Sequence, residues 1–298
     1  MPSPVGIAKN LVEAARHVLS QSLICRHRRK SFDFCGKPFV HTTPDGTQFE
    51  LYPGEFVDRD VYAFGAYERH FLDLLKSRLK GGRSFLDVGA NIGNHALALR
   101  GVFDQVHCFE PNPIILERLR RNIALNAAGN VFVHPVGLGA ANADLPFMQD
   151  LTGNMARGSF VYEGDAEPIL LPVVNGSQYI GQHGITGIDF IKVDVEGSEP
   201  EVFRGLREVI AAHRPIVAFE YHGHLEPIET WQAIVASLPG YVFAEAIPPA
   251  PAGALAKLAF AVRHGTQPPP AALDSPGERS YAAIFGFPSR EAFADFLA

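Results

Sequence analysis

The sequence predicts an α/β fold in which a parallel sheet is covered by helices. Two observations predict it: short apolar runs alternate with segments of helical periodicity from residue 84 onwards, and a glycine-containing turn, VGANIG (88–93), follows the first of these runs. Apolar strands that alternate with helices are typical of parallel sheets, because helices cover both faces and leave the strands buried.

The expected elements follow in chain order. An amphipathic helix over 5–24 precedes the basic cluster CRHRRK, and a β-hairpin over 37–53 turns at Asp45-Gly46. A second amphipathic helix covers 65–82. After it we expect strands at 84–88, 105–109, 131–136, 189–194, 215–221, 241–246 and 281–287, and helices at 91–100, 113–126, 199–213 and 228–238.

This order divides the chain into an appendage of helix and hairpin, residues 1–64, and one α/β domain, residues 65–298. The stretches 140–178 and 247–277 interrupt the alternation and contain many turn-forming residues. We expect both to be long loops, which in a compact domain are often functional.

Composition narrows the class of protein. The 298 residues are 47% hydrophobic, which is enough for a substantial core, and the net charge of −6 disfavours a nucleic-acid partner. Cys25, Cys35 and Cys108 are scattered, so we expect a reducing compartment without a disulfide framework. No apolar run reaches the roughly 18 residues of a membrane-spanning helix. We therefore expect a cytoplasmic protein; the pattern does not predict its oligomeric state.

Residues at the ends of the first two predicted strands of the domain indicate a cofactor site, since ligands of doubly wound sheets lie at the carboxyl ends of strands. The dinucleotide fingerprint G-x-G-x-x-G is incomplete, because Gly89 and Gly93 lack the middle glycine. Asp87 would repel a pyrophosphate but attract an ammonium group, which favours the amino-acid end of S-adenosylmethionine. Glu110 can accept hydrogen bonds from ribose hydroxyls of either cofactor, so an NAD-dependent oxidoreductase remains the alternative.

Six motifs in the same order resemble those of the FkbM-type S-adenosylmethionine-dependent methyltransferases: GAYE (65–68), FLDVGANIG (85–93), FEPNP (109–113), RNIALN (121–126), IDFIKVDVEGSEPEVFRG (188–205) and FEYH (219–222). The resemblance implies a Rossmann-like class I methyltransferase fold, with a seven-stranded, mostly parallel sheet and one antiparallel strand near the C-terminus. It also implies O-methylation of a hydroxyl on a small molecule, glycan or secondary metabolite.

By position, the resemblance implies cofactor contacts from eight residues: Asp87, Gly89, Ala90, Asn91, Gly93, Glu110, Pro111 and Glu68. One segment departs from the family pattern. VVNGSQYI (173–180) contains no acid where family members commonly carry a Thr-Leu-Asp-like sequence. A relative that binds the cofactor without catalysis therefore also remains open.

Four side chains near the expected methyl group are candidates for the general base that an alcohol nucleophile needs. Asp194 and Glu196 follow the strand at 189–194, while Glu220 and His222 alternate at the end of the next strand and so share a face. The choice among the four stays open. Such a cluster also raises the hypothesis of a bound divalent metal ion, but no spacing of ligands in the sequence requires one, and we predict no metal site.

The polar segment GNMARGSF (153–160) lies in the first long loop. Loops of this kind often close over substrates. We therefore expect acceptor contacts from Asn154, Arg157 and Ser159.

Overall fold

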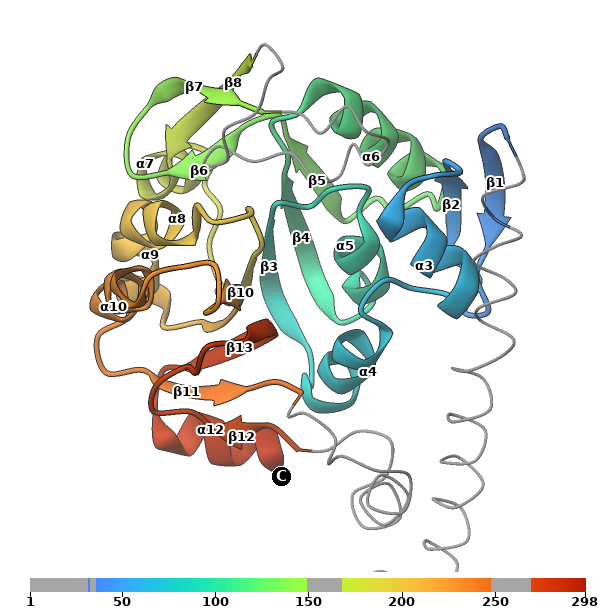
Figure 1. The fold of residues 1–298 in the computed structure, drawn as a ribbon. Helices are drawn as coiled ribbons and strands as arrows, with labels where there is room; N and C mark the ends of the chain where they lie inside the picture. The colour runs from blue at the N-terminus through green and yellow to red at the C-terminus, as the bar shows by residue number, and fades with distance from the viewer. Residues whose placement is uncertain (1–31, 33–35, 149–167, 248–268) are drawn as a thin grey trace, which may run out of the picture.

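An eight-stranded sheet forms the centre of the protein (Figure 1), a computed structural model that describes residues 32, 36–148, 168–247 and 269–298. The strand order is β12-β11-β13-β10-β9-β3-β4-β5. In chain order these strands are β3 (Gly82–Val88), β4 (Phe103–Phe109), β5 (Val131–His134), β9 (Ile188–Val193), β10 (Ile216–His222), β11 (Val242–Glu245), β12 (Ala271–Ala272) and β13 (Ser280–Phe287).

The directions of the strands confirm the predicted Rossmann-like sheet. β5, β4, β3, β9 and β10 run parallel, whereas β13 is antiparallel to both β10 and β11. These seven strands are the ones predicted from the alternation and the family resemblance. The two-residue β12 pairs with β11 and extends the edge to eight strands.

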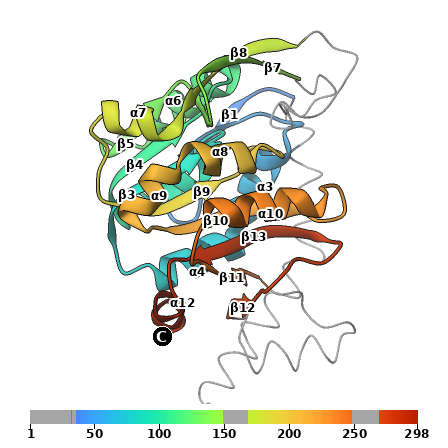
Figure 2. The same ribbon diagram turned by 90° about the vertical axis from the view of Figure 1, so that its left-hand side faces the viewer.

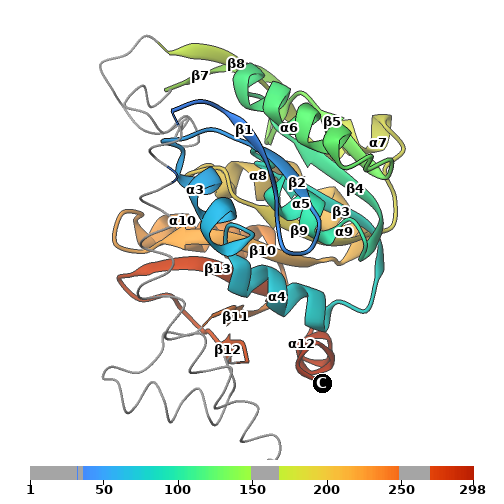
Figure 3. The ribbon, with the colours of Figure 1, turned by 90° about the vertical axis from the view of Figure 1, so that its right-hand side faces the viewer.

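Two layers of helices cover the sheet. One face packs on α3 (Phe56–Phe64), α4 (Arg69–Arg78), α5 (Asn94–Leu99), α6 (Pro113–Leu125) and α12 (Arg290–Leu297), and the other on α7 (Gly176–Gln182), α8 (Glu199–Gly205), α9 (Arg207–His213) and α10 (Ile228–Ser237). Figure 2 shows the α7–α10 side and Figure 3 the side of α3–α6. None of the helices in the described ranges is both long and apolar enough to cross a membrane.

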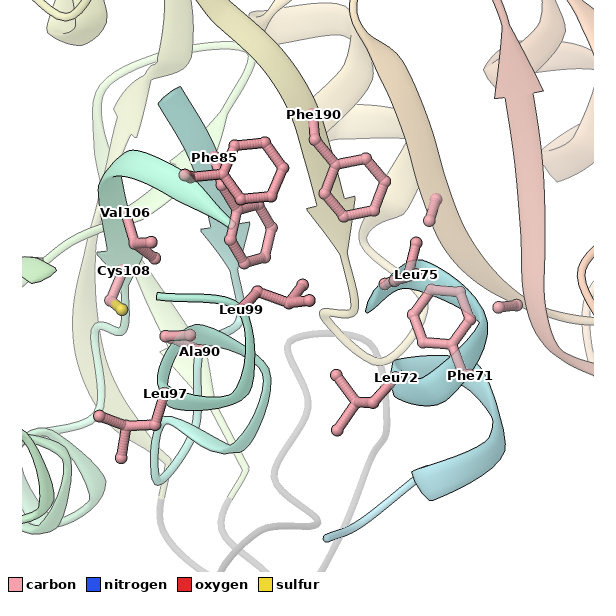
Figure 4. Close-up of a cluster of buried hydrophobic side chains, with 14 of the residues drawn as sticks. Phe71, Leu72, Leu75, Phe85, Ala90, Leu97, Leu99, Val106, Cys108 and Phe190 are labelled. Atoms are coloured by element: carbon pink, nitrogen blue, oxygen red, sulfur yellow. The ribbon is translucent and has the colours of Figure 1, made fainter. Parts of the chain in front are cut away.

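Alternating side chains of each strand supply the two hydrophobic cores. Phe85 and Phe190 project toward α4 and α5, where they meet Phe71 and Leu99 (Figure 4). Leu86 and the other alternate residues face α7–α10. Because both faces are covered, the buried parts of the strands are mainly apolar, and a charged residue buried inside one of them needs a specific partner.

Several boundaries differ from the predictions for physical reasons. The helix expected from residue 65 begins at Arg69, because Gly65 (φ 85°) ends α3, which was not predicted, and Glu68 (φ 51°) is also left-handed. The helix expected over 199–213 is two short helices that meet at Leu206.

The stretch 140–178 is not a single long loop. It contributes to a separate three-stranded sheet, β6-β8-β7, made of β6 (Gly137–Gly139), β7 (Ala143–Phe147) and β8 (Ile169–Asn175). The helix expected over 5–24 lies outside the described residues, as does most of 247–277.

The predicted hairpin is confirmed as β1 (Phe39–Thr42) paired antiparallel with β2 (Gln48–Leu51). β2 is fastened to α6: the backbone N–H groups of Gln48 and Glu50 donate to the side chains of Asn126 and Asn122, at 2.9 and 2.8 Å. The described part of 36–64 therefore packs into the core of the α/β unit. The division at residue 64 stays a prediction.

A buried ion pair between Asp58 of α3 and Arg118 of α6 ties this segment down, with side chains 1% and 4% exposed. We predict that Asp58→Ala lowers the free energy of unfolding by about 3–5 kcal/mol, because it leaves the Arg118 charge buried without its partner. Urea unfolding followed by circular dichroism measures the change. Asp73→Ala, which breaks the exposed Arg69–Asp73 pair (3.3 Å), should cost less than about 1 kcal/mol. Equal losses for the two variants would contradict the prediction.

Candidate functional site

A cavity of about 760 Å³ lies at the carboxyl ends of the central strands. Its floor comes from the residues that follow or end four neighbouring strands: Gly89 after β3, Glu110 after β4, Asp194 after β9 and His222 at the end of β10. Its walls are largely apolar and come from α3 and from the β6-β8-β7 sheet, including Phe56, Val57, Leu138, Leu145, Phe147 and Val173. The cavity therefore has a polar floor and hydrophobic walls.

The turn after β3 is held by its own backbone. All five N–H groups of residues 89–93 donate inside the protein: two to the carbonyl of Phe109, one to the carboxylate of Glu110 and two within the turn. The helix expected over 91–100 begins only at Asn94, so these five N–H groups belong to the turn and are used within the protein.

Close packing explains the two glycines of the turn. A Cβ at Gly89 (φ 81°) would collide with the backbone carbonyl of Asp194, and one at Gly93 (φ 88°) would lie 2.8 Å from Leu119. Only glycine combines a left-handed backbone with this absence of a side chain at low cost. Both glycines therefore let neighbouring parts of the protein approach, and Gly89 in addition lines the cavity.

Glu110 is aimed by two backbone groups. Its carboxylate oxygens accept from the N–H groups of Asn91 (3.0 Å) and Asn112 (2.9 Å), and the side chain lines the cavity although the residue is only 8% exposed. Burial raises the pKa of Glu110 to about 7, partly offset by these two hydrogen bonds. Each oxygen keeps a lone pair for a further donor, such as a hydroxyl of a ligand.

Behind the floor lies a buried charge cluster made of Glu68, Asp87, His95, Lys192 and Asp194. Lys192 Nζ lies 2.9 Å from Asp194 Oδ2, and His95 Nε2 lies 3.0 Å from Glu68 Oε2. Burial raises the pKa of Glu68 to about 8 and lowers that of His95 to about 3. Both are therefore largely uncharged at neutral pH, and Lys192 is the cation of the cluster.

Asp87 occupies an unexpected place in this cluster. Its side chain is fully buried beside Lys192, its register partner across β3 and β9. It faces the backbone N–H of Ala96, but neither oxygen reaches hydrogen-bond geometry with a described group. Burial raises its pKa, and Lys192 opposes the shift. Asp87 and Glu68 do not line the cavity, so their predicted cofactor contacts stay predictions.

The four candidate bases meet on the floor: Asp194, Glu196, Glu220 and His222 all line the cavity. His222 Nε2 lies 3.2 Å from Glu220 Oε1, and this contact raises the pKa of His222 to about 9. Burial and the nearby Asp194 charge raise the pKa of Glu220. His222 is thus charged at neutral pH and unsuited to accept a proton, whereas Glu220 can accept one. The choice of the general base among the four residues stays a prediction.

The donor atoms of Glu196, Glu220 and His222 lie within 4.8 Å of one another, which is close enough for a shared cation. The ion pair between Glu220 and His222 already uses two of these groups. The absence of a resident metal stays a prediction.

The structure brings most of the predicted residues to one cavity and leaves others away from it. Besides the four candidate bases, the predicted residues that line the cavity are Gly89, Asn91, Glu110 and Pro111. Ala90 and Gly93 belong to the same turn but are buried and do not line the cavity. Asn154, Arg157 and Ser159 lie outside the described residues, so nothing is added to their predicted role.

Sequence reasoning missed two residues of the site. Tyr67 lines the cavity, and burial together with four neighbouring acidic side chains, Glu68 among them, raises its pKa so that it stays a proton donor. Lys192 is 4% exposed inside an apolar strand. A lysine in the run IDFIKVDV was the available signal, because a buried lysine needs a carboxylate partner.

The sequence matches the family model described as "Methyltransferase FkbM domain" over residues 87–243, more than half of the chain. The matched region contains the glycine turn, Glu110 and the ends of β9 and β10. The chain belongs to the FkbM methyltransferase family. Its Rossmann-like sheet is the class I methyltransferase arrangement that the sequence predicted.

The sequence identity to individual relatives is modest. The chain is 27% identical to the hexuronic acid methyltransferase AglP of Haloferax volcanii over 160 residues, which cover 54% of this chain and 64% of AglP. It is 30% identical to the 31-O-demethyl-FK506 methyltransferase FkbM of Streptomyces tacrolimicus over 186 residues, 52% of this chain and 69% of that protein. The match thus spans less than two thirds of AglP.

Among solved structures, the methyltransferase FkbM of Methylobacillus flagellatus aligns with a TM-score of 0.43 at 21% identity. The alignment covers 70% of this chain and 44% of that one.

The packing of Gly89 against Asp194 generates a prediction for this FkbM-family chain. Gly89→Ala should cost more stability than Gly46→Ala, which has the same left-handed backbone (φ 86°) but open space around it. The backbone conformation alone costs about 1–2 kcal/mol in each variant, and the excess measures the collision with the Asp194 carbonyl. Thermal and urea unfolding compare the two. A Gly89 variant no less stable than the Gly46 variant would show that the turn tolerates a side chain.

Proposed function

We propose that this chain is an S-adenosylmethionine-dependent O-methyltransferase that acts on a hydroxyl of a small molecule or glycan. The observation that carries the proposal is a single cavity with a backbone-aimed carboxylate, Glu110, at one end and the Asp194–Glu220–His222 group at the other. Membership of the FkbM methyltransferase family supports the same conclusion.

The residues present fit the cofactor. The Glu110 carboxylate accepts one backbone hydrogen bond on each oxygen and faces the cavity. Each oxygen can accept a further hydrogen bond, which suits the two hydroxyls of a ribose. Asn91 and Gly89 lie beside it and would contact the remainder of the cofactor. When bound, S-adenosylmethionine supplies an electrophilic methyl group next to a positive sulfur.

The protein's own part in the reaction is to orient the hydroxyl and to take its proton. Glu220 is the group we assign to this role, because its pKa is raised toward neutrality and it faces the cavity. His222 is charged and bonded to Glu220 at 3.2 Å, so it orients that carboxylate and does not itself act as the base. Most of the acceleration should come from alignment of the hydroxyl with the methyl group.

The lining of the cavity disfavours an anionic acceptor. Among the described lining residues there are five carboxylates, those of Glu110, Asp194, Glu196, Glu201 and Glu220, and no lysine or arginine. The apolar walls of the cavity suit a hydrophobic portion of the acceptor. AglP acts on a hexuronic acid and the Streptomyces relative on 31-O-demethyl-FK506. By charge, we expect the acceptor here to differ from a hexuronic acid, whose carboxylate the five lining carboxylates would repel.

Cofactor choice is tested first, by calorimetric titration of the wild type with S-adenosylmethionine and with NAD. We expect binding of the first only, and a Kd for it at least about tenfold weaker in Glu110→Gln, because a hydrogen bond to a charged carboxylate contributes about 1.5–3 kcal/mol. Glu201→Gln, a lining carboxylate paired with Arg204 at 2.7 Å, is the matched control and should bind normally. A wild type that binds NAD, or neither compound, would refute the cofactor assignment.

The base assignment predicts a pH profile. Turnover is measured as S-adenosylhomocysteine release in a screen of neutral and anionic hydroxyl acceptors. We expect kcat to fall about tenfold per unit as the pH drops below the raised pKa of Glu220, because the protonated carboxyl cannot accept the hydroxyl proton.

The same measurement on Glu220→Gln should show kcat reduced by about 10²–10⁴-fold and the acid limb removed. Its affinity for S-adenosylmethionine should stay within about twofold, which separates catalysis from cofactor binding. An acid limb that persists in Glu220→Gln would move the role to another group. Cofactor binding without turnover of any acceptor would favour the non-catalytic relative.

A further inference from the structure

Lys192 occupies an unusual place for a lysine. It lies in β9, one of the central strands, with Asp87 of β3 as its register partner on one side and Ala218 of β10 on the other. Its side chain shares a sheet face with Phe85 and Phe190, the face that α4 and α5 cover (Figure 4), and the residue is 4% exposed. A charge at such a position costs several kcal/mol unless it is paired.

The partner that connects Lys192 to the cavity is Asp194. Asp194 lies two residues after Lys192, so its side chain projects to the same side of the sheet as the lysine. Its Oδ2 lies 2.9 Å from the lysine Nζ. The Asp194 side chain is 26% exposed and lines the cavity, whereas Lys192 is closed off behind it. The ion pair therefore has a buried end and a cavity end, and only the carboxylate can meet a ligand.

Asp194 stands among like charges. Burial raises its pKa, but the charge and hydrogen bond of Lys192, together with smaller contributions that include a hydrogen bond with Glu220, bring the pKa below its ordinary value. Glu220 lies close by, and Glu68, Glu196 and Glu220 all act with Asp194 on the hydroxyl of Tyr67. Without the lysine, a carboxylate in this setting would take up a proton and become neutral.

The position of Asp194 along the floor indicates what it faces. Its backbone carbonyl packs on Gly89, beside the expected cofactor, and its side chain lies next to Glu220, the assigned base. The reacting methyl group must lie between cofactor and base. Asp194 is thus placed at the sulfur end of the cofactor.

We propose that Lys192 is a positioning residue: through its ion pair it holds Asp194 as an anion on the cavity floor, and Asp194 thereby makes the protein prefer S-adenosylmethionine over S-adenosylhomocysteine. The inference rests on the proposed function. In the transfer, the acceptor oxygen forms a bond to the methyl carbon, the sulfur–carbon bond breaks with its electron pair going to sulfur, and the hydroxyl proton goes to Glu220. The sulfur becomes neutral, so its attraction to Asp194 is lost and release of the product is favoured.

The test is a comparison of ligands by calorimetry: S-adenosylmethionine, sinefungin, whose protonated amine replaces the sulfonium, and the neutral S-adenosylhomocysteine. For Lys192→Met and for Asp194→Asn we expect the preference for the two cationic ligands over the neutral one to fall about tenfold, equivalent to ~1.4 kcal/mol. The Kd of S-adenosylhomocysteine should stay within about twofold. A merely structural lysine would weaken all three ligands together.

The control is Asp189→Asn, a carboxylate of the same strand that faces Arg83 at the surface and should leave all three affinities unchanged. Circular dichroism checks folding; where Lys192→Met is unfolded, Lys192→Gln supplies the neutral variant. Equal weakening of cationic and neutral ligands, or a changed preference in Asp194→Asn but not in the lysine variant, would overturn the inference. A wild type that binds none of the three would instead refute the proposed function, and the inference with it.

Discussion

The approach of the Gly89 backbone to the carbonyl oxygen of Asp194 is the contact on which the cavity depends. It joins the turns that follow two neighbouring parallel strands, β3 and β9, and leaves no room for a side chain between them. Because these turns meet, the polar residues that follow β4 and end β10 come to the same floor, with Glu110 on one side and Glu220 on the other. A single steric requirement thus sets the distance between the expected cofactor end and the expected reaction end.

A second constraint is the burial of charge beneath that floor. A parallel sheet covered by helices on both faces excludes water from its central strands, so each ionisable group there needs a counter-charge or must stay neutral. Lys192 and Asp194 form an ion pair, so each has its counter-charge. Glu68 and His95 stay uncharged and share one hydrogen bond. Burial and pairing also separate the pKa values of Asp194, Glu220 and His222 on the floor: that of Asp194 lies below its ordinary value, and those of Glu220 and His222 lie above theirs.

The walls of the cavity have a different origin. They come from α3 and from the three-stranded sheet of β6, β7 and β8, which lie outside the alternation of strand and helix. β6 and β7 have only three and five residues, and the stretch around them is rich in turn-forming residues, so local propensity predicts a loop. They are held by pairing between β8 and strands 30 or so residues earlier, for example Val173 with both Gly137 and Ala143. Pairing at that separation leaves only a weak signal in a short window of sequence.

The sequence by itself determined the strands of a parallel sheet and the position of the polar residues at their carboxyl ends, because hydrophobic periodicity reports which faces are buried. The one antiparallel strand was implied by the family resemblance. It also placed Glu110, Asp194, Glu196, Glu220 and His222 near one another. The tertiary structure alone decided their pairing and their pKa values, because those depend on neighbours from other strands. Asp87 illustrates the difference: the sequence predicted a cofactor contact, which stays a prediction, whereas only the structure shows that its side chain is fully buried beside Lys192, its register partner.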